Sequence, residues 1–449
     1  MVAYNAGLMA EPRIVPRDQH PISRRDIDPD ALKVLYRLRQ YNHTAYLVGG
    51  SVRDLLLDRR PKDFDVGTSA HPYQVKKLFR NCWIIGRRFR LAHVKFGPKI
   101  IEVATFRRQV APGEEVVQDG VPAPVHHQPA ERGEPAPDEQ DWEARSAGAN
   151  KEHLIHRDNT FGTPEEDAFR RDFTINALFY DIATFSIIDY VNGLDDLRDR
   201  IVRSIGDPDV RLREDPVRML RAIALAARLD FTIEPTLVEA IRTHRHEIAK
   251  SSPARMLEEY YKILRAGSAE RAFRGLDDVG LLEPTSPELH RHAGEPLWRS
   301  LARLDSYRRR FEAMPDTLTN SILLGTLLLP LGLTFNRNQP PPRLGALPLA
   351  RRDVERLRQI LGLQRRLRDI NAAPRAQRAL AHRSVFRDAL TWLEIHGEAP
   401  DLVAHWKGLV ESGVPHELPG QGAEGEPPPF RRRRRRRRRR RPLHHKGAG

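Results

Sequence analysis

Asp63 and Asp65 are the two residues whose type and spacing most directly indicate chemistry. One residue separates them in the segment KDFDV, and residues two apart in an extended strand project to the same face of a sheet. Two carboxylates on one face can hold a pair of divalent cations, the arrangement that phosphoryl transfer uses. A lone pair of this kind is also common on solvated strands, so the neighbouring residues decide between the two interpretations.

The segment just before these aspartates has the pattern of a phosphate-binding turn. Tyr46–Val48 predicts a short buried strand, Gly49 and Gly50 permit a sharp turn, and Ser51 is expected to cap the helix that follows. A helix N-terminus presents unpaired N–H groups and a partial positive charge, to which Arg53 adds its own. The segment matches neither GxxxxGK nor GxGxxG, so it predicts a triphosphate site in a different nucleotide-binding fold.

A third acidic group would complete a two-metal site, and two residues are candidates. Glu102 lies on the predicted strand IIEVATF, where its apolar neighbours would bury it and a buried carboxylate needs a partner. Asp172 follows Arg170 and Arg171, which is typical either of a ligand contact or of an ordinary salt bridge with one of the two arginines. The sequence leaves both candidates open.

The positive charge of the chain is concentrated near its C-terminal end. The 449 residues carry a formal net charge of +15, and without the eleven arginines Arg431–Arg441 and Lys446 about +3 remains. Such a tail cannot bury a core and is expected to bind a polyanion, most simply nucleic acid, although an anionic membrane surface or the ribosome would attract it too. The single cysteine, Cys82, excludes an internal disulfide and any cysteine-rich metal site.

No segment has the pattern of a membrane span or of a signal peptide. The longest apolar run, Ile322–Phe335, contains two glycines and a proline and is shorter than the ~20 residues that a bilayer requires, so it predicts a core segment. The N-terminal segment contains acids and prolines and lacks a continuous apolar stretch. We therefore expect a soluble, cytoplasmic protein.

The elements that must position these residues follow from the hydrophobic periodicity. Strands and helices alternate after Pro29, and LAHVKFGPKIIEVATF predicts a hairpin that turns at Gly97–Pro98. Pro216, preceded by two acids, predicts the start of a helix over VRMLRAIALAARL, with arginines on one face and apolar residues on the other. From there to about Gly413 the chain reads as helical.

Four motifs, in this order, resemble one family. They are VGGSVRDLLL…KDFDV, GRRFRLAHV…IEVATFR, RRDFTINALFYD and EDPVRMLRA. Together they are similar to the class II nucleotidyltransferases, the bacterial poly(A) polymerases and the CCA-adding tRNA nucleotidyltransferases, over roughly residues 29–275. The resemblance implies an α+β fold, with a polymerase-β-like head that contains a mixed sheet, an all-helical neck and body, and a disordered basic tail.

The composition and the resemblance together predict the domain boundaries. The expected domains are a flexible arm (1–28), a nucleotidyltransferase head (29–205) with a mobile insertion (109–150), a helical neck that binds nucleotide and RNA (206–270), a helical RNA-binding body (271–415) and a disordered arginine-rich tail (416–449).

The resemblance also implies roles for individual residues. It implies that Asp63 and Asp65 bind two Mg²⁺ ions and that Asp172 belongs to the active site, with Glu102 as the other candidate third carboxylate. It assigns Gly49, Gly50 and Arg53 to the triphosphate of ATP, and Asp215 and Arg218 to the edge of the incoming base. An Asp/Arg pair suits that task because it supplies an acceptor and a fixed fork of donors. The tail arginines are expected to bind RNA; they begin with Arg431, Arg432, Arg433, Arg434 and Arg435.

The expected activity is the template-independent addition of AMP from ATP to RNA 3′ ends, with release of pyrophosphate and a consequent promotion of RNA turnover. GRRFRLAHV is closer to the poly(A) polymerase version of this motif, and a polyarginine tail suits an enzyme that grips any RNA through its phosphates. An RNA decay machinery or an RNA chaperone is a candidate partner. CCA addition to tRNA and non-catalytic RNA binding are the alternatives, and the intact Asp63, Asp65 and Asp172 argue against the second of these.

Overall fold

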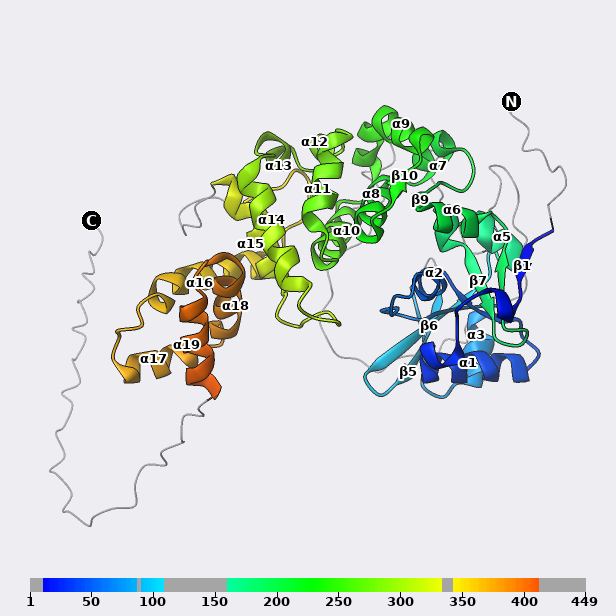
Figure 1. Ribbon diagram of the computed structural model, residues 1–449, viewed down its shortest axis with the longest axis horizontal. Helices are drawn as coiled ribbons and strands as arrows, with labels where there is room; N and C mark the ends of the chain where they lie inside the picture. The colour runs from blue at the N-terminus through cyan, green and yellow to red at the C-terminus, as the bar shows by residue number, and fades with distance from the viewer. Residues whose placement is uncertain (1–10, 87–89, 109–159, 333–341, 412–449) are drawn as a thin grey trace, which may run out of the picture.

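The computed structural model describes residues 11–86, 90–108, 160–332 and 342–411. The predicted insertion at 109–150 and the predicted tail at 416–449 lie outside the described residues. The described part of the chain forms an arc, with a sheet and its helices at the N-terminal end, a middle group of helices, and a C-terminal helical group at the far end (Figure 1). This arrangement confirms the expected α+β fold, with a mixed-sheet head and a helical body.

The head is built on one mixed, eight-stranded sheet in the order β1-β8-β7-β2-β3-β6-β5-β4. Its strands are β1 Arg13–Val15, β2 Ala45–Val48, β3 Asp65–Thr68, β4 Cys82–Ile85, β5 Leu91–Phe96, β6 Lys99–Thr105, β7 Leu178–Asp181 and β8 Ser186–Asp189. The β3–β6 pair is parallel and the other neighbouring pairs are antiparallel. The hairpin predicted to turn at Gly97 is confirmed as β5 and β6.

The two faces of the sheet bury different side chains because successive residues of a strand point to opposite sides. Leu47 and Tyr180 belong to the large core on the face that α1 (Pro29–Gln40) covers. Val48 and Phe179 belong to a smaller cluster, which lies on the other face. The helix α1 begins as its sequence predicts, because the Asp28 carboxylate accepts a hydrogen bond from the Asp30 N–H group at 2.8 Å.

The expectation of a flexible arm over residues 1–28 is wrong for residues 11–28. Strand β1 pairs with β8 at the sheet edge, and Ile22 and Ile27 are almost fully buried. The short 3₁₀ helices η1 (Arg17–Gln19) and η2 (Arg24–Asp26) connect this strand to α1. The segment is too short to show a hydrophobic period, so its burial depends on a long-range pairing that local patterns do not encode.

The remaining helices of the head are α2 Gly50–Leu56, α3 Pro72–Leu78, α5 Pro164–Phe169, η3 Thr174–Asn176 and α6 Gly193–Asp199. A two-stranded parallel sheet of β9 (Ile201–Val202) and β10 (Thr232–Ile233) joins the head to the helices that follow. At this junction the Arg59 guanidinium donates to the carbonyl oxygens of Arg228 and Leu229, at 3.3 and 3.2 Å. Head and neck are therefore connected through the C-terminal end of α8 (Val217–Leu229).

The neck and body are helical, as predicted. Besides α8 they contain α7 Pro208–Glu214, α9 Pro235–His244, η4 Arg245–Lys250, α10 Pro253–Arg265, α11 Ala269–Asp278, α12 Leu282–Thr285, α13 Pro287–Arg291, α14 Glu295–Arg308, α15 Asn320–Leu328, η5 Leu329–Leu331, α16 Arg351–Leu367, α17 Pro374–Ala381, α18 Phe386–His396 and α19 Pro400–Glu411.

The apolar segment that begins at Ile322 is core, as predicted, over its described residues. Every residue of α15 from Ser321 to Leu328 is buried, and a Cβ added at Gly325 would lie 2.5 Å from the Trp392 ring. The close approach of α15 to α18 therefore requires glycine at this position. Among the described residues, no helix is long and apolar enough to cross a membrane.

Candidate active site

The glycine turn after β2 places α2 at the centre of the head. Gly49 has a φ of 72°, and its N–H group donates to the Leu178 carbonyl oxygen of β7 at 3.2 Å. The helix begins at Gly50, two residues earlier than expected, and Ser51 does not cap it. The Ser51 hydroxyl instead donates to the Val48 carbonyl oxygen at 3.0 Å, which fixes the turn. The Ser51 capping prediction is therefore wrong, because Gly49 can adopt the required conformation without a side-chain cap.

The two aspartates of the motif lie in different local structures. Asp65 is the first residue of β3 and pairs with Val48, whereas Asp63 precedes the strand. The Asp63 side chain is 74% exposed and lies 3.6 Å from the Lys62 ammonium. The strand argument from the sequence thus holds for Asp65, and Asp63 comes from the loop beside it.

Glu102 lies next to Asp65 in the sheet. Val66 of β3 is paired in parallel with Val103 of β6, so the residues that precede them, Asp65 and Glu102, are neighbours on the same face. Burial, together with the negative charges of Glu102 and Asp63, raises the pKa of Asp65 to about 6, against the opposing charge of Arg171. Asp65 therefore lies near two further carboxyl groups, Glu102 on the neighbouring strand and Asp63 on the loop before β3, whose charges oppose its ionisation.

Glu102 itself is half exposed, which corrects the expectation that its apolar neighbours bury it. Ile101 and Val103 point into the core, and the alternation of the strand turns Glu102 to the open face. There its Oε1 atom lies 3.6 Å from His93 Nε2 of β5. Trp83 of β4 pairs with His93 in the register and is 52% exposed, so an aromatic side chain and a histidine extend the row of carboxylates across the sheet.

Arg171 lies at this site but does not form the salt bridge with Asp172 that the sequence left open for it. Its Nε and Nη2 atoms donate to the Asp167 carboxylate at 3.1 and 2.9 Å, and Arg170 donates to the same carboxylate at 2.9 Å. Burial opposes ionisation of Asp167, but the charges of Arg171 and Arg170 hold its pKa below the ordinary value. A Cβ added at Gly49 would lie 3.0 Å from Arg171 Nη1, so this guanidinium lies against the glycine turn.

Asn176 joins three parts of the site. Its side-chain oxygen accepts a hydrogen bond from Arg53, its Nδ2 atom donates to Asp172 at 3.2 Å, and its carbonyl oxygen accepts from Arg171 at 3.1 Å. Arg53 is almost fully buried and also pairs with Asp54, at 2.6 Å. The Arg53 guanidinium is therefore fixed beside Gly50 by residues of its own helix and of η3. In the sequence, the only signal for Asn176 is its place at the end of the RRDFTIN motif.

Asp172 is paired with the neck and not with the arginines beside it. Its Oδ2 atom lies 2.7 Å from Arg221 Nη2 of α8, and its Oδ1 atom accepts the Phe173 N–H group at 2.9 Å. Burial opposes its ionisation, but Arg221 and these hydrogen bonds hold the pKa of Asp172 below the ordinary value. The salt bridge that the sequence suggested with Arg170 or Arg171 is absent, because both arginines turn to Asp167.

The side chains of the two residues expected to read the base have different partners, although the Arg218 N–H group donates to the Asp215 carbonyl oxygen at 3.0 Å. Asp215 forms a bidentate pair with Arg255 of α10, at 2.9 and 2.7 Å. Arg218 is buried and donates to the Arg211 carbonyl oxygen at 2.8 Å and to Glu214 at 3.3 Å. Pro216 precedes the first turn of α8 as its N-cap residue. Arg255 is thus a partner of this region that the sequence did not indicate, because it lies on another helix.

The carboxylates at this site are ligands of the kind that Mg²⁺ prefers. Among the residues that the structure describes, no group of three or more His, Cys, Asp or Glu side chains is gathered as a ready metal site. The chemistry nevertheless suits a hard cation, because Asp63, Asp65 and Glu102 supply only oxygen ligands. A cation bound nearby would also offset the negative charges of Glu102 and Asp63, which raise the pKa of Asp65.

Two of the predicted features cannot be placed. Arg431–Arg435 of the predicted RNA-binding tail lie outside the described residues, as do residues 87–89 of the GRRFRLAHV segment.

Family models match three parts of the chain. Residues 45–203 match the poly A polymerase head domain, and residues 230–292 match the probable RNA and SrmB-binding site of polymerase A. Residues 343–441 match the polymerase A arginine-rich C-terminus. Together these models cover the head, much of the neck, and the C-terminal region.

Individual relatives fall into two groups. The chain is 48% identical to the poly(A) polymerase I of Salmonella typhimurium over 282 residues, which are 63% of this chain and 55% of that protein. It is 34% identical to the CCA-adding enzyme of Lactobacillus helveticus over 258 residues, 58% of this chain and 55% of that protein. The chain therefore spans about half the length of the curated relatives it matches.

A solved structure supports the fold over a longer stretch. The crystal structure of the Bacillus stearothermophilus CCA-adding enzyme in complex with CTP aligns with a TM-score of 0.59 and 26% identity. The alignment covers 86% of this chain and 83% of that one, so the helical body is shared as well as the head.

Proposed function

Because the chain belongs to the family that carries the poly(A) polymerase head domain, we propose that it adds AMP from ATP to RNA 3′ ends without a template and releases pyrophosphate. The observation that carries the chemistry is the placement of Asp65 beside Glu102 on β3 and β6, with Asp63 on the adjoining loop. Phosphoryl transfer needs such a carboxylate group because its transition state accumulates negative charge that must be offset.

The proposal gives the three carboxylates the task of holding two Mg²⁺ ions. When bound, these ions lower the pKa of the attacking 3′-hydroxyl and offset the charge at the reacting phosphorus. Asp65 supplies the rigid ligand because it lies on a strand, and Asp63 supplies the adaptable one because it lies on an exposed loop. Glu102 is assigned as the third carboxylate in preference to Asp172, since Asp172 is already paired with Arg221.

The triphosphate is assigned to the glycine turn. The backbone of Gly49 and Gly50 allows close approach, and the guanidiniums of Arg171 and Arg53, both held by Asn176, lie against these two glycines. Asp172 has a positioning role in this arrangement, since it orients Asn176 and thereby Arg53 while it ties the head to Arg221 of the neck. Two hydrogen bonds from Arg255 hold the Asp215 carboxylate in one orientation, and we assign this carboxylate to the edge of the incoming base.

The RNA 3′ end is assigned to the open face of the sheet beyond Glu102. Trp83 is exposed there and pairs in register with His93, which contacts Glu102. An exposed indole beside a carboxylate site offers a stacking surface for the terminal base, and stacking tolerates any base. This suits an enzyme that elongates RNA regardless of sequence.

The sequence identities to the two groups of relatives favour polyadenylation over CCA addition. The chain is 48% identical to a poly(A) polymerase I and 34% identical to a CCA-adding enzyme over similar lengths. The match of residues 343–441 to the arginine-rich C-terminus favours the same choice. We place the reaction in the cytoplasm, where ATP and RNA are available, and expect it to feed RNA decay, because an unpaired 3′ tail is a substrate that a decay machinery or an RNA chaperone can bind.

The assay that separates the two activities uses one protein and two RNAs. Purified protein is incubated with Mg²⁺, either ATP or CTP, and either an arbitrary-sequence oligoribonucleotide or a tRNA that lacks its terminal CCA. Long A-tails on the arbitrary RNA support the proposal. CTP incorporation that is confined to the tRNA would replace it by CCA addition, and no incorporation in any of the four reactions would favour a non-catalytic RNA-binding protein.

A further inference from the structure

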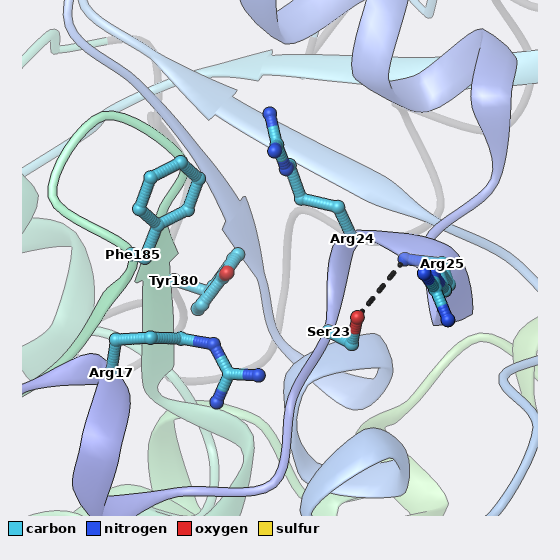
Figure 2. A pocket seen from close by; sticks show the side chains of 6 residues that line it. All are labelled: Arg17, Ser23, Arg24, Arg25, Tyr180 and Phe185. Atoms are coloured by element: carbon cyan, nitrogen blue, oxygen red, sulfur yellow. Dashed lines mark hydrogen bonds between the residues drawn. The ribbon is translucent and has the colours of Figure 1, made fainter.

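The head contains a cavity that none of the three carboxylates Asp63, Asp65 and Glu102 lines. It has a volume of about 280 Å³ and opens beside the N-terminal segment that was expected to be flexible (Figure 2). It is lined by Arg17, Ser23, Arg24, Arg25, Tyr180 and Phe185. A single water occupies about 30 Å³ of liquid, so the cavity has room for a small polyatomic ligand.

The cavity lies on the sheet face opposite Asp65. Val48 pairs with both Asp65 and Phe179, whereas Tyr180 pairs with Leu47. Since neighbouring residues of a strand point to opposite faces, the Tyr180 side chain and the Asp65 carboxylate are on different sides of the sheet. The cavity is therefore separate from the site assigned to ATP and to the RNA 3′ end.

Three positive charges at the cavity have no carboxylate partner among the described residues. Arg17 donates to the His20 carbonyl oxygen at 2.9 Å, and Arg24 donates to the Tyr36 hydroxyl at 3.2 Å and lies over the Phe185 ring. Within the described part of the chain, the Arg25 guanidinium takes part in no hydrogen bond or ion pair, and only the Arg25 N–H group is bonded, to Ser23. Guanidinium groups elsewhere in the head, such as those of Arg170 and Arg171, are paired with aspartate.

The floor of the cavity carries an unused donor. Tyr180 is fully buried, and its hydroxyl has no hydrogen-bond partner. A buried hydroxyl without a partner costs free energy, and a ligand in the basic cavity that accepted a hydrogen bond from it would recover part of that cost. The Ser23 Oγ atom accepts from the Arg25 N–H group at 3.3 Å, which leaves the Ser23 hydroxyl hydrogen free to donate as well.

We propose that this cavity binds a phosphoryl group through Arg17, Arg25 and the Tyr180 hydroxyl. The lining offers several donors and no carboxylate, which suits an anion with three or more acceptor oxygens. Guanidinium groups match phosphate oxygens in geometry, and a phenol hydroxyl adds a fixed donor at the base. The phosphoryl group belongs either to a free ion such as pyrophosphate or to the 5′ end of an RNA.

The test compares variants that leave the fold intact. In Tyr180→Phe only the unpartnered hydroxyl is removed, so the protein should remain as stable as the wild type, and Arg17→Gln and Arg25→Gln each remove one charge. Arg24 is left unchanged because it also contacts Tyr36 and Phe185. The matched control is Arg37→Gln, since Arg37 is exposed on α1 and contacts the Tyr41 and Phe79 rings away from the cavity.

Affinity for inorganic pyrophosphate is measured by calorimetry on the full chain in EDTA. Loss of one hydrogen bond to a charged group predicts about tenfold or more weaker binding for each of the three cavity variants. Arg37→Gln should bind as the wild type does. Equal affinity of Tyr180→Phe and the wild type would overturn the proposal, because this variant removes a donor without changing the charge that the tail or the surface presents.

A second measurement distinguishes the source of the phosphoryl group. An oligoribonucleotide with a 5′-phosphate is compared with the same oligoribonucleotide carrying a 5′-hydroxyl. Tighter binding of the phosphorylated form by the wild type, but not by Tyr180→Phe, identifies the RNA 5′ end as the source. Equal binding of the two forms, with the pyrophosphate effect retained, identifies a free ion. The pyrophosphate result does not depend on the proposed polymerase activity, so either proposal can fail alone.

Discussion

Asp65 and Glu102 are neighbours on the parallel strands β3 and β6, each one residue before the paired valines Val66 and Val103. This pairing brings a carboxylate from a distant part of the sequence, that of Glu102, next to the aspartates of the KDFDV segment. It also explains why the pKa of Asp65 is raised to about 6, since burial and the charge of Glu102 act together on one carboxyl group.

The raised pKa of Asp65 predicts a pH-dependent cost to stability in the metal-free protein. A carboxyl group whose pKa rises on folding is protonated more readily in the folded state, so stability falls as the pH rises from about 4 to about 6. Asp65→Asn should remove this cost and stabilise the protein by roughly 1–3 kcal/mol at pH 8, with little effect at pH 4. Urea unfolding in EDTA at the two pH values measures the difference.

The control for this prediction is Asp18→Asn, which removes an exposed carboxylate from the same domain. Its unfolding free energy should match that of the wild type at both pH values. An Asp65→Asn protein that is less stable than the wild type at pH 8 would contradict the electrostatic interpretation of this site.

Substitution by alanine should have different effects at two glycines that both have a positive φ. Gly49 has a φ of 72° and lies against Arg171, whereas Gly97 has a φ of 58° and no atom within 4 Å of an added Cβ. Alanine at Gly97 costs roughly 1–2 kcal/mol of backbone strain, and alanine at Gly49 costs at least as much because its ψ of −135° lies outside the αL region. Gly49→Ala should in addition displace Arg171 and raise the KM for ATP, while Gly97→Ala should leave the KM unchanged. Steady-state kinetics of the two variants, with their thermal unfolding, separates strain from site geometry.

His396 of α18 predicts acid sensitivity in the C-terminal helices. Burial, with the nearby charge of Arg303, lowers the pKa of His396 to about 3, and its Nε2 atom pairs with the Thr326 hydroxyl at 3.1 Å. The unfolded state binds a proton near pH 6.5, so the stability contributed by the neutral ring is present above that pH and is lost as the pH falls from about 6.5 towards 3.

The free energy of unfolding of His396→Gln should therefore fall less on acidification than that of the wild type. From the pKa shift, the difference between the two losses should reach up to about a few kcal/mol near pH 4. Circular dichroism during urea unfolding at several pH values follows this change. His246→Gln, at an exposed position, is the control and should unfold like the wild type throughout.

The basic tail predicts a strong salt dependence of RNA binding. Each phosphate contact of a single-stranded RNA contributes about 0.7 to the slope of log affinity against log salt concentration. Truncation after Pro429 removes the eleven consecutive arginines and should weaken RNA binding and flatten this slope, while ATP binding is retained. Fluorescence anisotropy at several salt concentrations measures the slope, and an unchanged slope in the truncated protein would exclude the tail as an RNA contact.

The parts of the site that the sequence predicted are those held by local patterns. The strand–glycine–helix order around Gly49, the hairpin at Gly97 and the helix after Pro216 all follow from turn chemistry and short-range periodicity. The α+β fold is what the resemblance carried by four ordered motifs implies. These features depend on residues close together in the chain, which is why they can be read from it.

The parts that the sequence missed are pairings between distant elements. Asp172 pairs with Arg221 of α8 and not with its neighbour Arg171, and Asp215 pairs with Arg255 of α10. A charged residue has many partners of the opposite sign within a few positions, and only the fold decides which it meets. For the same reason the sequence predicts a flexible arm where β1 forms, since its pairing partner β8 lies far along the chain.

The most direct test of the central claim is the rate at which Asp65→Asn transfers AMP from ATP to an RNA 3′ end in Mg²⁺. Loss of a ligand to a catalytic metal predicts a fall in kcat on the order of a thousand-fold, and Glu102→Gln should fall at least roughly tenfold. Asp18→Asn should keep the wild-type rate. An Asp65→Asn protein that is folded and still transfers AMP at the wild-type rate would contradict the assignment of this row of carboxylates as the active site.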